Sequence, residues 1–344
     1  NDSITPKGDR YEIKVAINGD YFNLRTGYAT GGQVISGWYA LRFGEYSGGS
    51  GIIWTWDRRC LLGGNVRNDR KLQKLYMPDK STVLIDKLNG LRGDNELAVY
   101  TWQYADNTGN SNDGIEVLLC MEEPADGLSP NGRARGKVVQ VRRNAGATPL
   151  PYDHVVLSGN GKASEPLTRV QVGDTIGIEL GLTDYGNEDI GLAPADWRQA
   201  YASLGGPCCV LVNGKVPRHW EAKAAKLAKE GKKHGSVVKD PRTAIAFDKK
   251  YVYFLVIDGR SKESIGMTFT EAGQFCKDRL EATDAILQDG GGSSTLWVDG
   301  KVKNTPSGKI STGERHGALR AVANGVFIAI VHPRQQSDKF TSPS

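Results

Sequence analysis

Residues 251–300 carry a strand, a helix and a second strand within one short stretch. An apolar run of β-branched and aromatic residues at 251–257 predicts a buried strand that ends at the acidic turn Asp258-Gly259. Apolar residues then recur at roughly helical spacing from 272 to 282, and Thr268 can cap the helix that they predict. The stretch therefore opens as strand, loop and helix, with a carboxylate at the end of the strand.

The same stretch closes with three consecutive glycines between two apolar runs. Residues 285–287 predict a second strand, DGGGSS follows at 289–294, and residues 295–298 lead to a hairpin turn at Asp299-Gly300. Three glycines in a row cost conformational entropy, so they indicate a backbone with positive φ or one that another molecule approaches closely. Asp289 is therefore expected beside exposed backbone amides.

Three carboxylates surround this strand, helix and strand. They are Asp258, Glu271 and Asp289, and Arg242 and Arg260 supply positive charge nearby. Carboxylates and arginines gathered in one place are typical of acid/base sites for sugars or phosphates. The sequence therefore predicts such a site here, in which Asp258 either takes part in the chemistry or orients an arginine.

Four segments are similar to signature blocks of the phosphodiester glycosidase family. They are residues 241–244, 258–261, 268–271 and 289–295. Several blocks in one order are more specific than a single glycine motif. The resemblance implies a hydrolase that removes an α-linked N-acetylglucosamine from a phosphodiester and leaves a phosphomonoester.

Weaker blocks extend the resemblance toward both ends of the chain. Residues 16–22 resemble a block that implies Asn18 as an active-site polar group, whereas the family often has a small residue where this chain has Asp20. Residues 204–214 resemble a glycine-rich block. A last block carries an arginine that either Arg315 or Arg320 matches, and this choice stays open.

A further block contains Arg92 and Asn95, for which a hydrogen-bonded turn and a binding role are equally expected. Together, the residues and the resemblance give a predicted site. Its catalytic carboxylates are Asp289, Glu271 and Asp258. Its substrate-binding residues are Asn18, Arg242, Arg260, Thr268, Gly290, Gly291, Gly292, Ser293, Ser294, Arg315 and Arg320.

The glycine content predicts the fold class. There are 43 glycines, many in NG, DG and GG pairs, which favour short strands joined by turns. We expect an α+β fold with strand-rich mixed sheets and few helices. We expect one large catalytic domain at 1–334, with a lysine-rich insertion at 221–239 whose helix faces solvent, and a polar tail at 335–344.

Composition narrows the function classes. The formal charge of +5 is concentrated in residues 223–239, so no nucleic-acid face is implied. The five cysteines show no CxxC spacing, which argues against a thiolate metal site and favours buried thiols, with one disulfide left open. No apolar run approaches the ~18 residues of a membrane span.

Location, cofactor and partners follow from the resemblance. Asn1 is not followed by a signal-peptide pattern, so the protein is either cytosolic or lacks its signal here, and the family implies an extracellular or cell-envelope location. The expected partner is a carbohydrate or glycosyl-phosphate substrate. No cofactor is expected, and calcium or magnesium stays open.

The expected chemistry is cleavage of the sugar C1–O bond. The departing phosphomonoester is a weak base, so it needs stabilisation of its charge more than a general acid. Asp289 and Glu271 are the expected nucleophile or base, and the arginines and glycine-loop amides are expected to bind the phosphate.

Two alternatives belong to other classes. A metal-dependent phosphodiesterase would cleave at phosphorus with Asp258 and Asp289 on a divalent ion, although the five histidines form no i,i+4 pair. A non-catalytic carbohydrate-binding envelope domain would use tryptophans as stacking platforms.

Overall fold

A computed structural model of the chain describes residues 2–4, 10–44, 49–123, 127–232, 234–308 and 317–332. The described strands form three sheets, and the two described α-helices are α1 (His219–Lys229) and α2 (Phe269–Leu280). Strands far outnumber helices, which confirms the predicted α+β class. No helix in the described part of the chain is long and apolar enough to cross a membrane.

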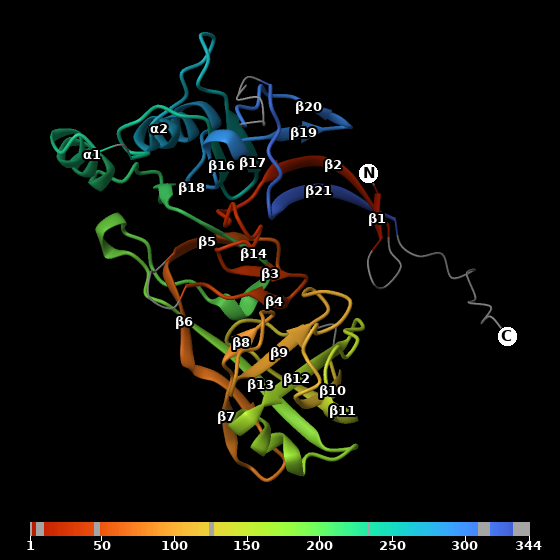
Figure 1. Cartoon of the computed structure of the whole chain (residues 1–344). Helices are drawn as coiled ribbons and strands as arrows, with labels where there is room; N and C mark the ends of the chain where they lie inside the picture. Colours follow the sequence, from red (N-terminus) through yellow and green to blue (C-terminus); the bar gives the residue numbers. More distant parts are fainter. Residues whose placement is uncertain are drawn as a thin grey trace.

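The largest sheet has twelve strands and runs through the middle and lower part of the molecule (Figure 1). Its order is β4-β3-β14-β5-β6-β13-β11-β10-β12-β9-β8, with β7 beside β6. Neighbours are antiparallel except β8 and β9, so the sheet is mixed. The strands are β3 (Gln33–Ile35), β4 (Trp38–Leu41), β5 (Gly49–Thr55), β6 (Cys60–Tyr76), β7 (Thr82–Leu84), β8 (Lys87–Leu88), β9 (Leu97–Thr101), β10 (Gly114–Met121), β11 (Arg133–Ala145), β12 (His154–Asn160), β13 (Thr175–Asp184) and β14 (Ala200–Gly206).

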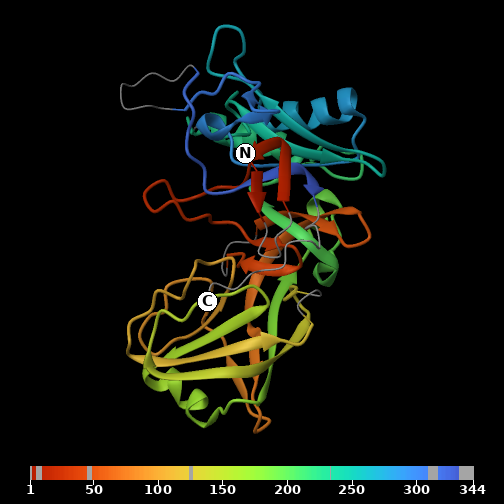
Figure 2. The ribbon, with the colours of Figure 1, turned by 90° about the vertical axis from the view of Figure 1, so that its right-hand side faces the viewer.

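The two smaller sheets lie at the other end of the molecule (Figures 1 and 2). In the five-stranded sheet, β2 pairs with β1, β19 and β21, and β19 pairs with β20. The four-stranded sheet has the order β15-β18-β16-β17. Their strands are β1 (Asp2–Ile4), β2 (Arg10–Asn18), β15 (Cys209–Leu211), β16 (Arg242–Phe247), β17 (Val252–Ile257), β18 (Asp284–Leu287), β19 (Leu296–Val298), β20 (Lys301–Val302) and β21 (Gly325–His332). Short 3₁₀ helices are η2 (Gly161–Arg169), η3 (Glu188–Ile190), η4 (Trp197–Gln199) and η5 (Gly291–Ser293).

The stretch from 251 to 300 folds largely as its sequence predicts. Thr268 and Glu271 form a reciprocal capping box at the start of α2. Asp299 and Gly300 both have positive φ, 44° and 84°, as a tight hairpin turn requires. The prediction of a buried strand was wrong in one respect, because the side chains of β17 are partly exposed on this edge strand.

A cluster of buried apolar side chains joins the three sheets. It includes Ile17 of β2, Leu204 of β14, Ile245 of β16 and Ile286 of β18, each at most 3% exposed. Burial of this kind contributes about 25 cal/mol per Å² of apolar surface. The packing of this cluster fixes the positions of these strands. The residues of the candidate site lie at or just beyond the strand ends.

Other sequence expectations have mixed outcomes. Helix α1 is mostly exposed, as expected for the first half of the lysine-rich insertion, but Trp220 anchors it to the core with only 8% exposure. All five cysteines are free thiols, so the disulfide that the sequence left open is absent. The predicted tail at 335–344 lies outside the described residues.

Candidate functional site

Chain segments distant in sequence meet where the three sheets join. Asp289 follows β18, Arg242 begins β16, and residues 19–21 follow β2. The backbone N–H of Asp289 donates to the Gly19 carbonyl over 3.0 Å. The predicted Asp289 therefore lies beside the segment that follows β2, at the other end of the chain.

Asn18 connects these segments from behind. Its Nδ2 donates to the Asp289 carbonyl over 2.6 Å, and its Oδ1 accepts from Thr243 Oγ1 at 2.7 Å and from Thr295 N at 3.1 Å. The residue is only 3% exposed. These contacts give Asn18 a positioning role in the described structure, and its predicted contact with substrate stays a prediction.

Asp289 is a buried carboxylate whose charge is only partly compensated. Burial raises its pKa, while the Ser293 hydroxyl, the Arg320 guanidinium and the Gly290 N–H act in the opposite direction. The residue is 8% exposed. A carboxylate with a raised pKa beside a guanidinium is suited to act as a base or nucleophile near neutral pH.

Asp20 is a second buried carboxylate at the same place, and sequence reasoning did not include it in the site. Burial raises its pKa to about 6, the Tyr21 N–H opposes this, and the charge of Asp289 adds to it. Its Oδ1 accepts from Tyr21 N at 2.7 Å. The one available signal was its position two residues after Asn18 in the block at 16–22.

Two glycines make room for Asp20. A Cβ atom on Gly31 would lie 1.7 Å from Asp20 Oδ2, and one on Gly205 would lie 2.5 Å from the same oxygen. Both distances are far below van der Waals contact, so neither position accepts a side chain while the carboxylate stays in place. These glycines belong to different parts of the sequence, and only the folded chain brings them together.

Two arginine side chains of the same chain lie close to the backbone of the triple glycine at 290–292. Gly291 has a φ of +60°. Cβ atoms on Gly291 and Gly292 would each lie 2.7 Å from an Nη2 atom, that of Arg260 and that of Arg320 respectively. The close approach that the sequence indicated is therefore already made by two guanidinium groups.

Several backbone N–H groups of the glycine loop already donate hydrogen bonds to carbonyls of the protein. The N–H of Gly291 donates to Pro241 O over 2.9 Å, and the N–H groups of Ser293 and Ser294 donate within the loop. Ser293 and Ser294 are at most 1% exposed. The expected phosphate cradle of free amides is therefore largely occupied, and substrate binding by Gly290 to Ser294 stays a prediction.

Arg242 is held mainly by backbone carbonyls. Its Nε donates to Met267 O at 2.8 Å, and its Nη2 donates to Val238 O at 2.7 Å and Gly235 O at 3.2 Å. Its guanidinium also lies over the Phe269 ring, 4.9 Å from the ring centre. In the part of the chain that the structure describes, Nη1 makes no hydrogen bond, so this atom can still donate to an anion.

The other predicted arginines have distinct surroundings. Arg260 makes a two-pronged ion pair with Asp240, with N–O distances of 2.6 and 2.9 Å. Arg320 lies beside Asp289 and donates to Ser293 Oγ over 3.4 Å. Arg315 lies in the stretch 309–316, outside the described residues. Of the two alternatives for the last block, Arg320 is thus the one whose position is known.

Glu271 and Thr268 hold the start of α2. The Glu271 carboxylate accepts from Thr268 N at 2.9 Å and pairs with Lys239 at 2.6 Å. Burial by itself raises the pKa of Glu271, but the Lys239 ion pair and the Thr268 hydrogen bonds outweigh it and lower the pKa. These contacts are those of a capping residue, and a catalytic role for Glu271 stays a prediction that they do not favour.

Asp258 holds a neighbouring loop. Its two oxygens accept from Thr305 N at 3.0 and 2.9 Å, and one also accepts from Asn304 Nδ2 at 3.0 Å. Asn304 in turn donates to the Ser294 carbonyl over 3.0 Å. Asp258 thus supports the end of the glycine loop and does not orient Arg242 or Arg260 in the described structure.

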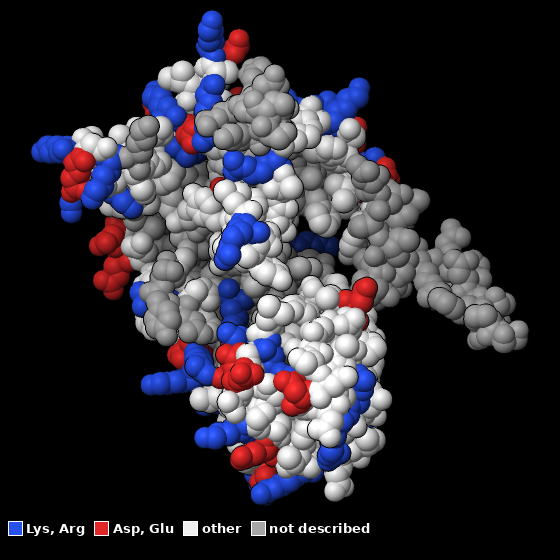
Figure 3. Space-filling view, in the orientation of Figure 1, with Lys and Arg blue, Asp and Glu red and all other residues white. Residues whose placement is uncertain are grey.

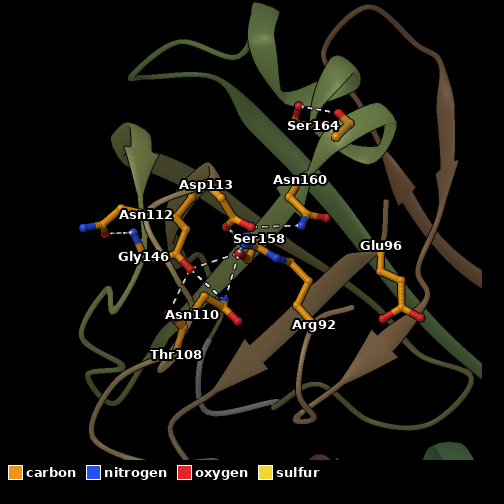
Figure 4. A network of polar contacts seen from close by, with 12 residues as sticks. Arg92, Glu96, Thr108, Asn110, Asn112, Asp113, Gly146, Ser158, Asn160 and Ser164 are labelled. Carbon is orange, nitrogen blue, oxygen red and sulfur yellow. Dashed lines mark hydrogen bonds and ion pairs between the residues drawn. The ribbon is translucent and has the colours of Figure 1, made fainter. Parts of the chain in front are cut away.

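Arg92 lies in a network of polar contacts on the twelve-stranded sheet (Figure 4). Arg92 Nη1 donates to Ser158 Oγ over 2.7 Å and its Nη2 pairs with Asp113. Glu116, at 0% exposure, accepts from Ser158 in the same network. Asn95 Oδ1 accepts from the backbone of residue 162 at 3.0 Å. The structure therefore favours the hydrogen-bonded turn for this block.

The chemistry of the site and a family comparison indicate the class of protein. Two buried carboxylates with raised pKa values beside a guanidinium can serve glycosidase-type hydrolysis. Residues 131–329, more than half of the chain, match the family model described as phosphodiester glycosidase. The chain belongs to this family. Asn18 and Asp20 lie outside the matched residues.

Solved structures support the fold. A hypothetical protein from Synechocystis is 18% identical, with a TM-score of 0.52, and the match covers 85% of this chain and 48% of that chain. A candidate exported protein from Burkholderia pseudomallei is 19% identical, with a TM-score of 0.56, covering 93% of this chain and 66% of the other. This chain therefore spans about half to two thirds of these proteins.

The zebrafish N-acetylglucosamine-1-phosphodiester alpha-N-acetylglucosaminidase catalytic domain, auto-inhibited by its pro-peptide, is 14% identical. The match covers 94% of this chain and 89% of that one, with a TM-score of 0.32, a value too low to establish a common fold. No curated protein sequence matches this chain.

Proposed function

We propose that this chain hydrolyses the C1–O bond of a glycosyl phosphodiester whose sugar is of the N-acetylglucosamine type. The observation that carries the proposal is the pair of buried carboxylates, Asp289 and Asp20, with Arg320 beside Asp289 and Arg242 Nη1 near Gly290. The phosphodiester glycosidase family supports the bond that is broken. The sugar and the group attached to the phosphate are the finer parts of the proposal.

In this proposal the two carboxylates carry the sugar chemistry. Asp289 acts at the anomeric carbon as nucleophile or base, and Asp20 is the second carboxylate that glycoside hydrolysis requires. Burial raises the pKa of both groups, and the charge of Asp289 adds to the rise at Asp20. The departing phosphomonoester needs little protonation, so neither group has to be a strong acid.

Arginines stabilise the phosphate in the proposed reaction. Arg320 lies beside Asp289, and Arg242 directs one unpaired donor atom, Nη1, toward the Gly290 side of the loop. A guanidinium stabilises the negative charge of a leaving phosphate in a site with little water. Glu271 and Asp258 then have positioning roles, because they hold α2 and the loop at 304–305.

The test is hydrolysis of an N-acetylglucosamine-1-phosphodiester in water enriched in ¹⁸O. Native chain is expected to place the label on the sugar, and Asp289→Asn is expected to lower kcat on the order of 10³-fold or more. Asp94→Asn, which changes an exposed carboxylate in the lower part of the molecule, is the matched control.

Label in the phosphate would overturn C1–O cleavage and favour attack at phosphorus. Loss of activity with a chelator, restored by calcium or magnesium, would favour the metal-dependent phosphodiesterase. Native activity in Asp289→Asn would remove Asp289 from the mechanism.

We also propose an extracellular or cell-envelope location. The support is the family and the Burkholderia pseudomallei structure, whose name describes a candidate exported protein. Fractionation of the source cells with an antibody to the chain tests this, and detection in the cytosolic fraction alone would contradict it.

A further inference from the structure

A cavity lies next to the candidate site. It has a volume of about 510 Å³ and lies between the loop that carries η3, the first turn of α1 and the segment 207–209. Neither Asp20 nor Asp289 lines it. Cys208 connects the two places, because it lines the cavity and its carbonyl accepts from the backbone N–H of Leu287, two residues before Asp289, over 3.0 Å. Cavities of ~300–1,000 Å³ are the usual size of small-ligand sites.

The cavity is bordered by uncompensated negative charge. Glu188 and Asp189 are exposed, and their carboxylates make no ion pair or hydrogen bond within the described residues. Acidic side chains stand out beneath α1 at the left margin of the molecule in Figure 3. Lys223 is close enough to lower the pKa of His219, but its ammonium lies over the Trp220 ring, 5.3 Å from the ring centre. A phosphate group would be repelled here.

Aromatic and amide groups complete the lining. Tyr185 is 57% exposed, and the Arg67 guanidinium lies 5.5 Å from its ring centre. The rings of His219 and Trp220 lie 4.1 Å apart. Burial is the main cause that lowers the pKa of His219, so its imidazole is uncharged at neutral pH. Asn187 adds an amide that can both donate and accept.

We infer that this cavity binds a sugar residue without negative charge, as a second carbohydrate subsite next to the candidate hydrolytic site. Carboxylates and an amide accept hydrogen bonds from sugar hydroxyl or amino groups, and the aromatic rings pack against the apolar face of the sugar. No lysine or arginine of the described residues lines this cavity, although Arg67 and Lys223 contact rings at its border, whereas Arg320 lies beside Asp289 on the proposed phosphate side. The inference rests on the proposed function for its class of ligand.

The test measures sugar binding with the hydrolytic site disabled. A chain carrying Asp289→Asn and Arg320→Ala is titrated with N-acetylglucosamine, glucosamine and glucose 1-phosphate, and binding is read by saturation-transfer NMR. N-acetylglucosamine and glucosamine are expected to bind at millimolar concentration, and glucose 1-phosphate at least tenfold more weakly.

Two changes in the cavity test its location. The pair Glu188→Gln and Asp189→Asn, or Tyr185→Ala alone, is expected to weaken binding of both amino sugars at least tenfold. Asp94→Asn with Glu165→Gln, two exposed carboxylates elsewhere, is the control, and circular dichroism confirms that each variant is folded. These residues are exposed, so their replacement does not disturb the core.

The outcomes are distinct. Unchanged binding in both cavity variants, no sugar binding at all, or equal binding of glucose 1-phosphate would overturn the subsite. An inactive native chain that still binds amino sugars through Glu188 and Tyr185 would overturn the proposed hydrolysis and leave the subsite in place.

Discussion

Asp20 stands out among single residues because its burial has an energetic cost. Its pKa is raised to about 6 from an ordinary 3.8, mainly by burial. In the folded chain it therefore holds its proton at pH values where the unfolded chain has lost it. The contribution to stability is present below about pH 4 and is lost as pH rises through about 6.

Asp20→Asn is therefore expected to stabilise the protein and impair catalysis. Asparagine keeps an oxygen that accepts from Tyr21 N, and it removes the buried charge, so the free energy of unfolding at pH 8 should rise by about 2–3 kcal/mol. We expect kcat/KM to fall on the order of 10²-fold. Denaturant unfolding at pH 4 and pH 8 measures the first effect, and the gain should vanish at pH 4.

The pH profile of the native chain gives an independent check on Asp20. The acid limb of kcat/KM is expected near pH 6 and should be absent from Asp20→Asn. Asp94→Asn should keep the limb. An unchanged limb in Asp20→Asn would exclude Asp20 from the titration that controls activity.

Sequence reasoning placed Asp289 in the predicted site and left Asp20 out for a physical reason. Asp289 belongs to a local signal, a strand followed by three glycines, and this signal can be read within a few residues. The surroundings of Asp20 are made by Gly31 and Gly205, which come close only after β14 has paired with β3. Glycines that are distant in the sequence produce no recognisable pattern around the carboxylate that they bury.

Helix α2 shows the same difference between features set by local sequence and features set by contacts with distant residues. Its start was predicted from Thr268, and the structure confirms the cap. Glu271 was assigned to catalysis because carboxylates cluster in that stretch, yet its oxygens contact Thr268 and Lys239. Caps follow from short-range spacing, whereas the role of a carboxylate depends on which other elements approach it.

Glu271→Gln is expected to keep most of the activity. Glutamine also fits a capping box, so the Thr268 N–H keeps its acceptor and kcat should fall less than about tenfold. Glu271→Ala removes the cap and should lower the free energy of unfolding by about 1 kcal/mol. Steady-state kinetics and thermal unfolding of the two variants measure these effects. A loss on the order of 10³-fold in Glu271→Gln would instead restore Glu271 to the catalytic pair.

At the scale of the whole molecule, the twelve-stranded sheet runs from the lower part to the candidate site. Strand β6 pairs with β5 at its start and with β13 farther along, so it connects the lower part with β5 and β14 near the site (Figure 1). The α+β class was predictable from glycine-rich turns, but this strand order was not, because pairing between distant strands has no local signal. We propose that residues 1–334 act as one catalytic domain.

Glu116 offers a test of this single domain. Its buried carboxylate accepts from Thr108, Asn110, Ser158 and the backbone N–H of Thr148, at 2.8–3.0 Å. Burial by itself raises its pKa, but these hydrogen bonds outweigh it, so its contribution to stability is present above about pH 4.5 and lost as pH falls.

Glu116→Ala is expected to lower the free energy of unfolding by about 2–4 kcal/mol, because four donors lose their acceptor. If the chain is one cooperative unit, calorimetry shows one transition at a lower temperature, and activity is lost at that same temperature. Glu165→Gln, an exposed carboxylate on η2, should leave the transition in place. A second transition, with activity surviving the first, would divide the chain into two domains.

The pairing of β2 with β21 also has a consequence for synthesis. Residues 19–324 separate β2 from β21 in the sequence, and the two strands pair along their whole length. The segment carrying Asn18 and Asp20 therefore stays without this partner strand until β21 has left the ribosome. The candidate site cannot be complete before β21 has been made, so catalytic competence is expected only after that strand has paired with β2.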